Sequence, residues 1–312
     1  MISAQRILVT PRSLTAEPHP DIERLRDDGY EIVYSTAGAM PAEDELVALV
    51  PGCVGWLAGV EPVTRRVLDA ATDLRVISRN GVGIDNLPVD ILSEKGVKIV
   101  IAEGANAMGV AELTIGLLFS ALRAIPLSDA GIKKGGWPRV RGLEIQNRVI
   151  GIIGCGAIGR EVARMVIGLG ASVVAFDPAR PNLDLPSSRF SYAGIDDILD
   201  SCDVLTLHCP LPRDGSTLIS PERIGRMKKS AVIINTARAR LIDEPALIEA
   251  LDEGRLSAYA TDVFDQEPPA SLSLASHPRV VATSHIGGFT EESVDRATRI
   301  AANNLIAALK AS

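Results

Sequence analysis

Short runs of β-branched and apolar residues alternate with helical patterns along nearly the whole chain. In the first third, five such runs predict strands at residues 7–10, 31–34, 54–57, 75–78 and 97–101. The segments between them repeat their apolar residues with helical spacing, and Gly29 and Gly96 end two of them. Strands that alternate with helices predict a parallel sheet covered by helices.

A longer apolar segment from residue 106 to about 124 predicts a helix, and the glycines and proline at 135–138 mark a loop after it. A second series of strands follows, with predicted strands at 149–153, 172–176, 204–208, 231–235, 258–262 and 280–283. A final helix is predicted over 291–309. The pattern therefore predicts an α/β protein with two Rossmann-like, doubly wound parallel-sheet domains.

Composition and charge narrow the possible partners. The chain has 312 residues, more than the ~100–200 of one domain. Its net charge of −7 argues against a nucleic-acid or anionic-membrane surface, because phosphate binding needs clustered Lys and Arg. No segment reaches the ~20 apolar residues that span a bilayer, and the start lacks the features of a signal peptide, so we expect a cytoplasmic protein. The cysteines form no CxxC pair, so we expect reduced thiols and no metal site.

A glycine-rich turn connects the first strand of the second series to the next helix. Gly154, Gly156 and Gly159 form a GxGxxG sequence with a strand before it and a helix after it. In this setting the first glycine permits the tight turn, and the second lets the backbone approach a pyrophosphate. The third lets the helix and the strand pack closely. Glycines that serve only tight packing are the alternative interpretation.

Asp177 ends the following strand of the second series. A carboxylate at this point can accept hydrogen bonds from the adenosine ribose hydroxyls, and it would repel a 2′-phosphate. The strand, turn, helix, strand and carboxylate together predict an NAD site. Arg180 nearby is the opposing feature, since an arginine can accommodate the 2′-phosphate of NADP. A solvated loop aspartate is the plain structural alternative.

The candidate reactive groups all follow strands of the second series. Arg238 comes after the predicted strand 231–235, Glu267 after 258–262, and His285 after 280–283. Ligands of open α/β sheets bind beyond the carboxyl ends of the strands, so these side chains are expected at the same edge as the glycine-rich turn. Each residue taken alone could be an ordinary surface or loop residue.

Hydride transfer to a 2-keto acid requires these three residue types. A guanidinium can hold the substrate carboxylate and polarise the carbonyl, and a histidine can protonate the forming alkoxide near neutral pH. A carboxylate hydrogen-bonded to the histidine would orient it and favour the imidazolium. We therefore predict a catalytic set of Arg238, Glu267 and His285, with His208 as the competing histidine on the same edge.

Four stretches resemble the D-isomer-specific 2-hydroxyacid dehydrogenases, and most closely the 3-phosphoglycerate dehydrogenase branch of that family. They are RNGVGIDN at 79–86, the glycine-rich turn with Asp177, NTARARLIDE at 235–244, and the DVF, EP and HIGG sequences within 262–288. The resemblance extends over nearly the whole chain.

The resemblance implies that Arg238, Glu267 and His285 are the family's catalytic Arg, Glu and His. It implies that backbone amides around Asn80-Gly81 help hold the substrate carboxylate, and that Arg238 and His285 also contact the substrate. Besides the three glycines, it implies that NAD lies near Ala157, Ile158, Asp177, Cys209, Pro210, Thr236, Ala237, Asp262 and Gly288.

The resemblance also implies a domain layout and an oligomeric state. Residues 102–284 would form the NAD-binding domain, inserted into a flavodoxin-like substrate domain made of residues 1–101 and 285–312. Members of the family are typically dimers built on the cofactor domain, with the segment near Trp137 involved. A homodimer is therefore expected.

The chain departs from the family pattern at two places. Ala239 follows the catalytic arginine where the family usually has glycine, and Ala102-Glu103 stands where a polar residue and a proline are usual. Glu103 adds a negative charge near the expected cofactor and substrate edge, which argues against phosphoglycerate itself as the substrate.

Three arginines predict a second anionic group on the substrate: Arg79, Arg139 and Arg141. 3-Phosphoglycerate carries such a group, and so do sulfo-, phosphono- and dicarboxylic hydroxy acids. Solvated surface arginines are the alternative interpretation. Two other functions stay open, namely a phosphite or formate dehydrogenase of the same fold and a non-catalytic NAD-sensing module like the corepressors that resemble this family.

Overall fold

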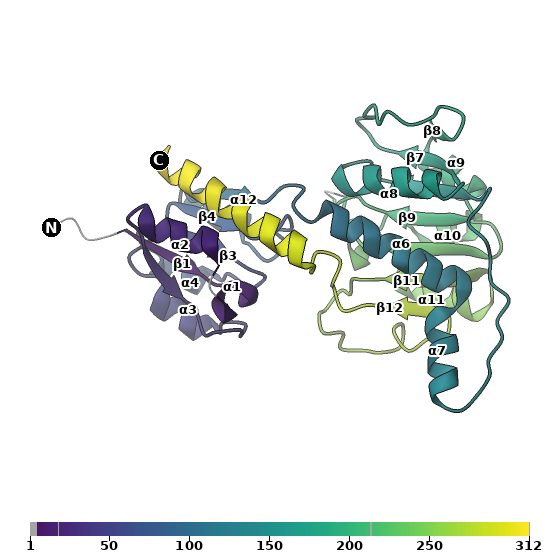
Figure 1. Ribbon diagram of the computed structural model, residues 1–312, viewed down its shortest axis with the longest axis horizontal. Helices are drawn as coiled ribbons and strands as arrows, with labels where there is room; N and C mark the ends of the chain where they lie inside the picture. The colour runs from purple at the N-terminus through teal and green to yellow at the C-terminus, as the bar shows by residue number, and fades with distance from the viewer. Residues whose placement is uncertain (1–4, 18, 213, 312) are drawn as a thin grey trace. The chain divides into compact units, whose positions relative to one another are not determined.

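The structure is a computed structural model that describes residues 5–17, 19–212 and 214–311. It divides into two compact units (Figure 1). Unit 1 comprises residues 1–106 and 291–312, and unit 2 comprises residues 107–290. The domain boundaries expected from the sequence, 101/102 and 284/285, lie a few residues before those of the units.

Unit 1 contains a five-stranded parallel sheet with the strand order β2-β1-β3-β4-β5. This is the order of a flavodoxin-like fold, as predicted. Its elements are β1 (Arg6–Val9), α1 (Arg12–Ala16), α2 (Pro20–Asp27), β2 (Glu31–Tyr34), α3 (Glu43–Leu49), β3 (Cys53–Ala58), α4 (Arg65–Ala70), β4 (Val76–Arg79), α5 (Val89–Glu94), β5 (Lys98–Ile101) and α12 (Glu291–Lys310).

Successive side chains of the unit 1 strands point to opposite faces and fill two cores. Ile7 packs with apolar residues of α2 and α12, whereas the next residue, Leu8, packs with those of α3, α4 and α5. A Cβ at Gly55 would lie 3.1 Å from the Cδ1 atoms of both Leu305 and Leu309. The glycine therefore lets α12 lie close against β3.

Unit 2 contains a seven-stranded parallel sheet with the order β12-β11-β10-β9-β6-β7-β8. The order reverses between β6 and β9, which is the switch point of a Rossmann fold. Its elements are α6 (Ala107–Arg123), α7 (Ile125–Lys133), β6 (Val149–Ile153), α8 (Ala157–Gly168), β7 (Ser172–Phe176), β8 (Phe190–Tyr192), α9 (Ile195–Ser201), β9 (Val204–Leu207), α10 (Pro221–Arg226), β10 (Ala231–Asn235), the 3₁₀ turn η1 (Ala239–Leu241), α11 (Glu244–Asp252), β11 (Leu256–Thr261) and β12 (Val280–Ala282).

Helices cover both faces of the unit 2 sheet. Apolar residues of α6 and α8 pack on one face together with Ile152, and those of α9, α10 and α11 pack on the other face together with Ile153. The sheet is therefore shielded from water on both sides. Its central strands are buried on both faces, as expected for a parallel sheet, whereas the edge strands β8 and β12 are partly exposed.

Strand β8 and helix α7 are among the elements of unit 2 that the sequence pattern did not predict. Strand β8 has three residues at the sheet edge, too few for a clear alternation. Helix α7 follows α6 after Ala124, whose φ of 48° is left-handed, and it buries none of its side chains. Its large apolar side chains, Ile125, Leu127 and Ile132, are exposed instead. Across the described ranges, no single helix is long and apolar enough to cross a membrane. The α6–α7 pair meets that test by length and composition, with a 67° bend.

Gly151 in β6 provides a test of this packing. A Cβ at Gly151 would lie 2.5 Å from Cγ2 of Ile198 and 3.0 Å from Cβ of Cys202. We expect Gly151→Ala to lower the free energy of unfolding by about 1–3 kcal/mol, the usual cost of overpacking a core. Urea unfolding followed by circular dichroism measures this change.

The matched control is Gly168→Ala. Gly168 lies near the end of α8, and no atom lies within 4 Å of an added Cβ. This substitution should be neutral or should stabilise the protein by up to about 1 kcal/mol. Equal stability of the two variants would contradict the tight contact between β6 and α9.

Candidate active site

The glycine-rich turn lies at the switch point of the unit 2 sheet, between β6 and α8. Gly154 has a φ of 98°, and a Cβ there would lie 2.4 Å from the carbonyl oxygen of His208. A Cβ at Gly159 would lie 1.9 Å from the carbonyl oxygen of Gly154. A Cβ at Gly156 would meet nothing within 4 Å. Close packing therefore requires glycine at positions 154 and 159. At Gly156 the missing side chain leaves open space beside the backbone.

This open space suits a phosphate group. Ala157 and Ile158 begin the 12-residue helix α8 just after Gly156. The first amide N–H groups of a helix have no partner inside it, and the helix dipole favours negative charge at that end. The backbone at Gly156 and α8 thus fits the pyrophosphate of a dinucleotide.

The carboxylate of Asp177 is held beside the glycine-rich turn. Its Oδ2 accepts a hydrogen bond from the amide N–H of Cys155 (2.8 Å), and its Oδ1 accepts one from Ala179 (2.8 Å). The Cys155 bond ties the end of β7 to the turn after β6. Arg180 has a left-handed φ of 43°. Asp177 therefore lies where a carboxylate can meet ribose hydroxyls.

The other residues expected near NAD follow neighbouring strands at the same sheet edge. Cys209 and Pro210 follow β9, Thr236 and Ala237 follow β10, Asp262 follows β11, and Gly288 lies in the loop between β12 and the end of the unit. The hydroxyl of Thr236 lies 3.1 Å from that of Thr114 on α6. The parallel sheet therefore gathers these segments around the switch point.

His285 and Glu267 are in direct contact. Nδ1 of His285 lies 2.7 Å from Oε2 of Glu267, and the amide N–H of Phe264 donates to Oε1 of the same carboxylate (3.0 Å). The side chain of His285 is 54% exposed and that of Glu267 is 37% exposed. The carboxylate therefore orients the ring through Nδ1 and leaves Nε2 as the nitrogen for a substrate.

Asp262 holds the loop that carries His285. Its buried carboxylate accepts hydrogen bonds from the Thr283 hydroxyl (2.6 Å), the Ile286 amide (2.9 Å) and the Gly287 amide (2.8 Å). These bonds surround His285, whose φ of 54° is left-handed. An αL conformation is uncommon for residues other than glycine, so the three bonds offset its cost. The sequence had suggested only a cofactor contact for Asp262.

Arg238 follows β10 in an extended conformation, at the start of η1. Its Nη1 donates to the carbonyl oxygen of Ala237 (2.7 Å). Two residues later, Nε of Arg240 lies 3.8 Å from Oδ1 of Asp265, which precedes Glu267 in the chain. The Arg238 turn and the Glu267 loop therefore adjoin, so the structure brings the three predicted catalytic residues to neighbouring strand ends.

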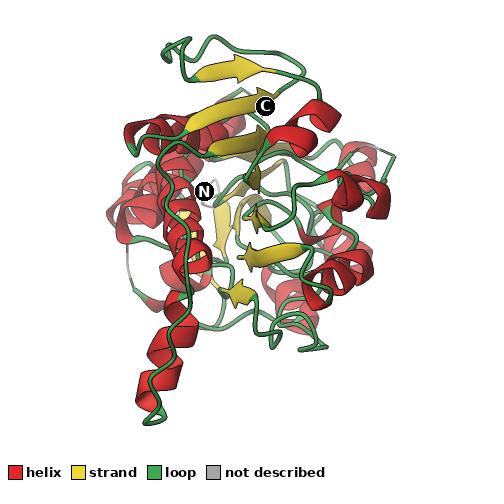
Figure 2. Ribbon diagram, turned by 90° about the vertical axis from the view of Figure 1, so that its right-hand side faces the viewer, coloured by secondary structure: helices red, strands yellow, loops and turns green. Residues whose placement is uncertain are grey.

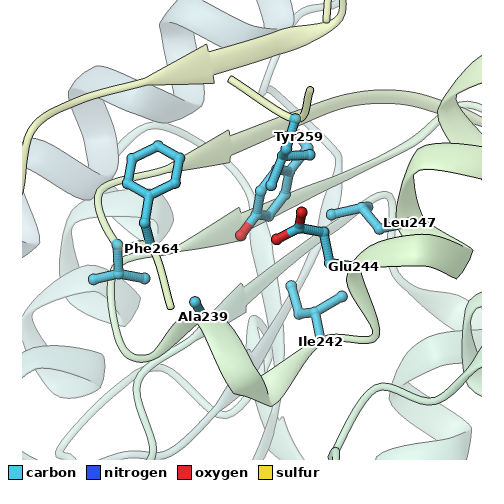
Figure 3. Close-up of a pocket in the computed structure, with 8 residues that line it drawn as sticks. Ala239, Ile242, Glu244, Leu247, Tyr259 and Phe264 are labelled. Atoms are coloured by element: carbon cyan, nitrogen blue, oxygen red, sulfur yellow. The ribbon is translucent and has the colours of Figure 1, made fainter. Parts of the chain in front are cut away.

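A small pocket lies next to the turn that follows Arg238, and Ala239 of that turn lines it (Figure 3). Its lining also includes Glu244, Tyr259 and Phe264. Ala239 stands where the related family usually has glycine. Burial raises the pKa of Tyr259 to about 12, so its hydroxyl stays protonated.

His208, the competing histidine, occupies a different environment. Its Nε2 lies 2.9 Å from the Thr206 hydroxyl, and its Nδ1 is buried without a hydrogen-bond partner among the described residues. Burial lowers the pKa of His208 to about 3. The ring is therefore neutral at physiological pH, which does not suit a proton donor.

The expected carboxylate-binding loop belongs to unit 1. Arg79, the last residue of β4, is only 8% exposed, and its Nη1 donates to the carbonyl oxygen of Asn80 (2.8 Å). Gly81 has a φ of 146°, and a Cβ there would lie 3.2 Å from Nη1 of Arg79. The guanidinium therefore supports the Asn80-Gly81 loop from inside.

The cysteines and the possible metal ligands lie as follows within the described ranges. No group of three His, Cys, Asp or Glu side chains there is arranged to hold a metal ion. The four cysteines are free thiols, and Cys53, Cys155 and Cys202 are buried. Burial raises the pKa of Cys155 and of the half-buried Cys209 to about 11, so neither is an activated nucleophile.

We expect His208 to remain neutral between pH 5 and 8. Its folded-state pKa of about 3 lies below the ~6.5 of an unfolded chain. Between these values only the unfolded state binds the proton. His208 thus contributes stability that is present above pH ~6.5 and is lost as the pH falls, by roughly 1 kcal/mol per pH unit. Imidazole ¹⁵N NMR measures the protonation directly. A His208 ring that titrates between pH 5 and 8 would contradict its burial.

Sequence comparison with known proteins agrees with this arrangement. The family described as "D-isomer specific 2-hydroxyacid dehydrogenase, NAD binding domain" matches residues 115–287. The chain is 38% identical to a D-3-phosphoglycerate dehydrogenase of Methanocaldococcus jannaschii over 298 residues, which are 94% of this chain and 56% of that protein. It is 37% identical to a hydroxypyruvate reductase of Thermotoga maritima over 260 residues, covering 81% of this chain and 84% of that one. The chain thus spans little more than half of the first relative.

Structural comparison gives the same result over both units. The crystal structure of the TT0316 protein from Thermus thermophilus matches 98% of this chain and 97% of its own, with a TM-score of 0.86 and 32% identity. The family match covers more than half of the chain and includes the glycine-rich turn, Asp177, Arg238, Glu267 and His285. The chain belongs to the D-isomer-specific 2-hydroxyacid dehydrogenase family and carries that family's NAD-binding domain.

Proposed function

We propose that the protein is an NAD-dependent dehydrogenase that interconverts a small 2-hydroxy acid and its 2-keto acid. The observation that carries this proposal is the 2.7 Å contact between His285 and Glu267 at the sheet edge that also bears the glycine-rich turn and Arg238. A histidine oriented by a carboxylate is a suitable general acid and base.

Each residue has a defined task in the proposed reaction. Bound NADH would supply the hydride that reduces the keto carbon. The guanidinium of Arg238 binds the substrate carboxylate and polarises the carbonyl, and backbone amides around Asn80-Gly81 help hold the carboxylate. Nε2 of His285 donates a proton to the forming alkoxide oxygen, while Glu267 holds the ring through Nδ1. In the oxidative direction Nε2 accepts that proton.

A second anionic group on the substrate is the finer part of the proposal. The guanidinium of Arg79 supports its own loop, so this part now rests on Arg139 and Arg141, which are exposed on the segment after α7. 3-Phosphoglycerate and its sulfo-, phosphono- and dicarboxylic analogues remain the candidates. One relative is named a phosphoglycerate dehydrogenase and another a hydroxypyruvate reductase, so dianionic and monoanionic acids both belong in the test.

A substrate panel tests the proposal. Purified protein is mixed with NADH and a series of 2-keto acids, including glyoxylate, pyruvate, hydroxypyruvate, oxaloacetate, phosphohydroxypyruvate and sulfopyruvate, and absorbance at the NADH band is followed. We expect turnover, with the highest kcat/KM for a dianionic acid. If a monoanionic acid has the highest kcat/KM, the proposal that the substrate carries a second anionic group is wrong. Absence of turnover with every acid, together with oxidation of formate or phosphite, would overturn the proposal.

Replacing the proposed proton donor should abolish most of the activity. We expect His285→Ala to lower kcat by about 10²–10⁴-fold, the usual contribution of general acid–base catalysis, with NADH binding unchanged. Glu267→Gln should also lower kcat, because the His285 ring loses the carboxylate that orients it through Nδ1. His208→Gln is the control and should keep most of the wild-type kcat. An active His285→Ala enzyme would exclude the assignment.

The position of Asp177 predicts a strong preference for NAD(H) over NADP(H). Asp177→Asn keeps an oxygen for the Cys155 amide but removes the charge, so the ratio of kcat/KM for the two cofactors should fall mainly through better use of NADPH. Asp177→Ala also loses that hydrogen bond and should weaken NADH binding as well. Similar kcat/KM for both cofactors in the wild type would refute the prediction.

We further propose that the protein is a homodimer formed through the α7 arm, which we define as residues 125–143. This arm projects from unit 2 as the lowest helix in Figure 2, with the returning chain beside it. It exposes Ile125, Leu127, Ile132, Val140 and Trp137, and Trp137 is 79% exposed. Several large apolar side chains exposed on one short segment are typical of an interface.

Light scattering after size exclusion tests the dimer. We expect a wild-type dimer and a monomeric double variant Ile132→Glu/Trp137→Glu, because buried charges without partners destabilise an interface. Leu272→Glu is the control, since Leu272 is an exposed apolar residue outside the arm. Wild-type protein that elutes as a monomer, or a double variant that stays dimeric, would exclude the arm as the interface.

A further inference from the structure

A polar residue, Asn235, ends a strand that is otherwise apolar. Strand β10 is buried at all five positions, and the side chain of Asn235 is 0% exposed. A buried amide costs free energy unless it is hydrogen-bonded. The partners of this amide therefore indicate why an asparagine stands where a fifth apolar residue would fill the same space.

Both ends of the Asn235 side chain bind the turn that follows. Its Oδ1 accepts a hydrogen bond from the amide N–H of Ala237 (3.0 Å), and its Nδ2 donates to the carbonyl oxygen of Arg238 (2.8 Å). These two bonds bracket Ala237 and Arg238. They fix the backbone from which the guanidinium extends.

Asn235 is itself held by the neighbouring strand. It pairs in register with Thr261 of β11, which is also fully buried, and its carbonyl oxygen accepts from the amide of Asp262 (3.1 Å). The Thr261 hydroxyl in turn accepts from the amide of Val263 (3.1 Å). The backbone of Asn235 is therefore fixed by the sheet, and its side-chain amide ties the Arg238 turn to that fixed backbone.

We propose that Asn235 is the positioning residue of Arg238. Its side-chain amide holds the turn so that the guanidinium presents one orientation to the substrate carboxylate. The inference rests on the proposed function, in which Arg238 binds that carboxylate. Paired hydrogen bonds between a guanidinium and a carboxylate depend on direction, so a small rotation of the turn weakens both. Misplacement by about 1 Å can cost about 10²-fold in rate.

Two substitutions test the positioning role. Asn235→Asp keeps the shape and the acceptor for Ala237 but places a carboxylate oxygen against the Arg238 carbonyl oxygen, and Asn235→Ala loses both bonds. We expect kcat/KM to fall by about 10- to 10²-fold in each, mainly through a higher KM for the acid. Binding of oxamate, a non-reacting analogue of a 2-keto acid, should weaken in parallel and by more than NADH binding, which is measured by fluorescence. Wild-type kcat/KM in both variants would overturn the inference.

A matched control separates positioning from stability. Asn304 makes the same kind of bond in unit 1, where its Nδ2 donates to the carbonyl oxygen of Ile101 (2.9 Å). Asn304→Ala should lower the melting temperature and leave kcat/KM and oxamate binding as in the wild type. If Asn235→Ala does not fold, the isosteric Asn235→Asp carries the comparison.

A double-mutant cycle on oxamate binding links Asn235 to Arg238. In an Arg238→Gln background, Asn235→Asp should weaken oxamate binding no further, because the group that it positions is gone. Full additivity of the two substitutions would show that Asn235 acts independently of Arg238 and would overturn the inference.

A crystal structure of Asn235→Asp decides the question without activity. We expect residues 237–238 to turn and the Arg238 guanidinium to move, while Asp262 and Glu267 keep their places. An unmoved turn overturns the inference even in an active enzyme. If the wild type reduces no 2-keto acid, the proposed function fails, and this crystal structure alone decides whether Asn235 sets the Arg238 turn.

Discussion

The buried sheet of unit 2 imposes the constraint on which its functional edge depends. Helices cover both of its faces, so polar groups at the strand ends lose contact with water and need partners in the loops. Asn235, Thr261 and Asp262 are three such groups at adjacent positions, and each binds backbone of a following segment. The hydrogen bonds that satisfy the sheet therefore also fix the loops that carry Arg238 and His285. The same hydrogen bonds therefore stabilise the buried sheet and place Arg238 and His285.

Much of this fold could be predicted because buried parallel strands are continuous apolar runs. The predicted strands 149–153, 172–176 and 231–235 have the bounds of β6, β7 and β10. The prediction failed where the physical signal is absent. Helix α7 buries no side chain, and β8 is too short to alternate. The last helix could be predicted because it has a face of small residues that packs within unit 1. Ala301 on that face is fully buried.

The candidate site was predictable in its residue types and only partly in its contacts. A parallel sheet brings its strand ends to one edge, so Glu267 and His285 could be expected together, but only folding shows the 2.7 Å contact. The burial of Arg79 could not be foreseen, since the last residue of a strand can face either side of a sheet. A signal for Asn235 did exist, as the one polar residue in a run of five buried positions. Its hydrogen bonds depend on the turn geometry, which the sequence does not reveal.

Two carboxylates five positions apart, Asp262 and Glu267, divide the tasks at this edge. Asp262 is 2% exposed and gives both oxygens to the loop around His285, so it cannot also hold the ring. Glu267 lies near solvent and holds the ring through one oxygen. A fully buried Glu–His ion pair would lose the hydration of both charges when the ring is protonated. Because Glu267 and His285 stay near water, the pair keeps part of its hydration. That same exposure would leave the loop loose, so the buried Asp262 has to fix it.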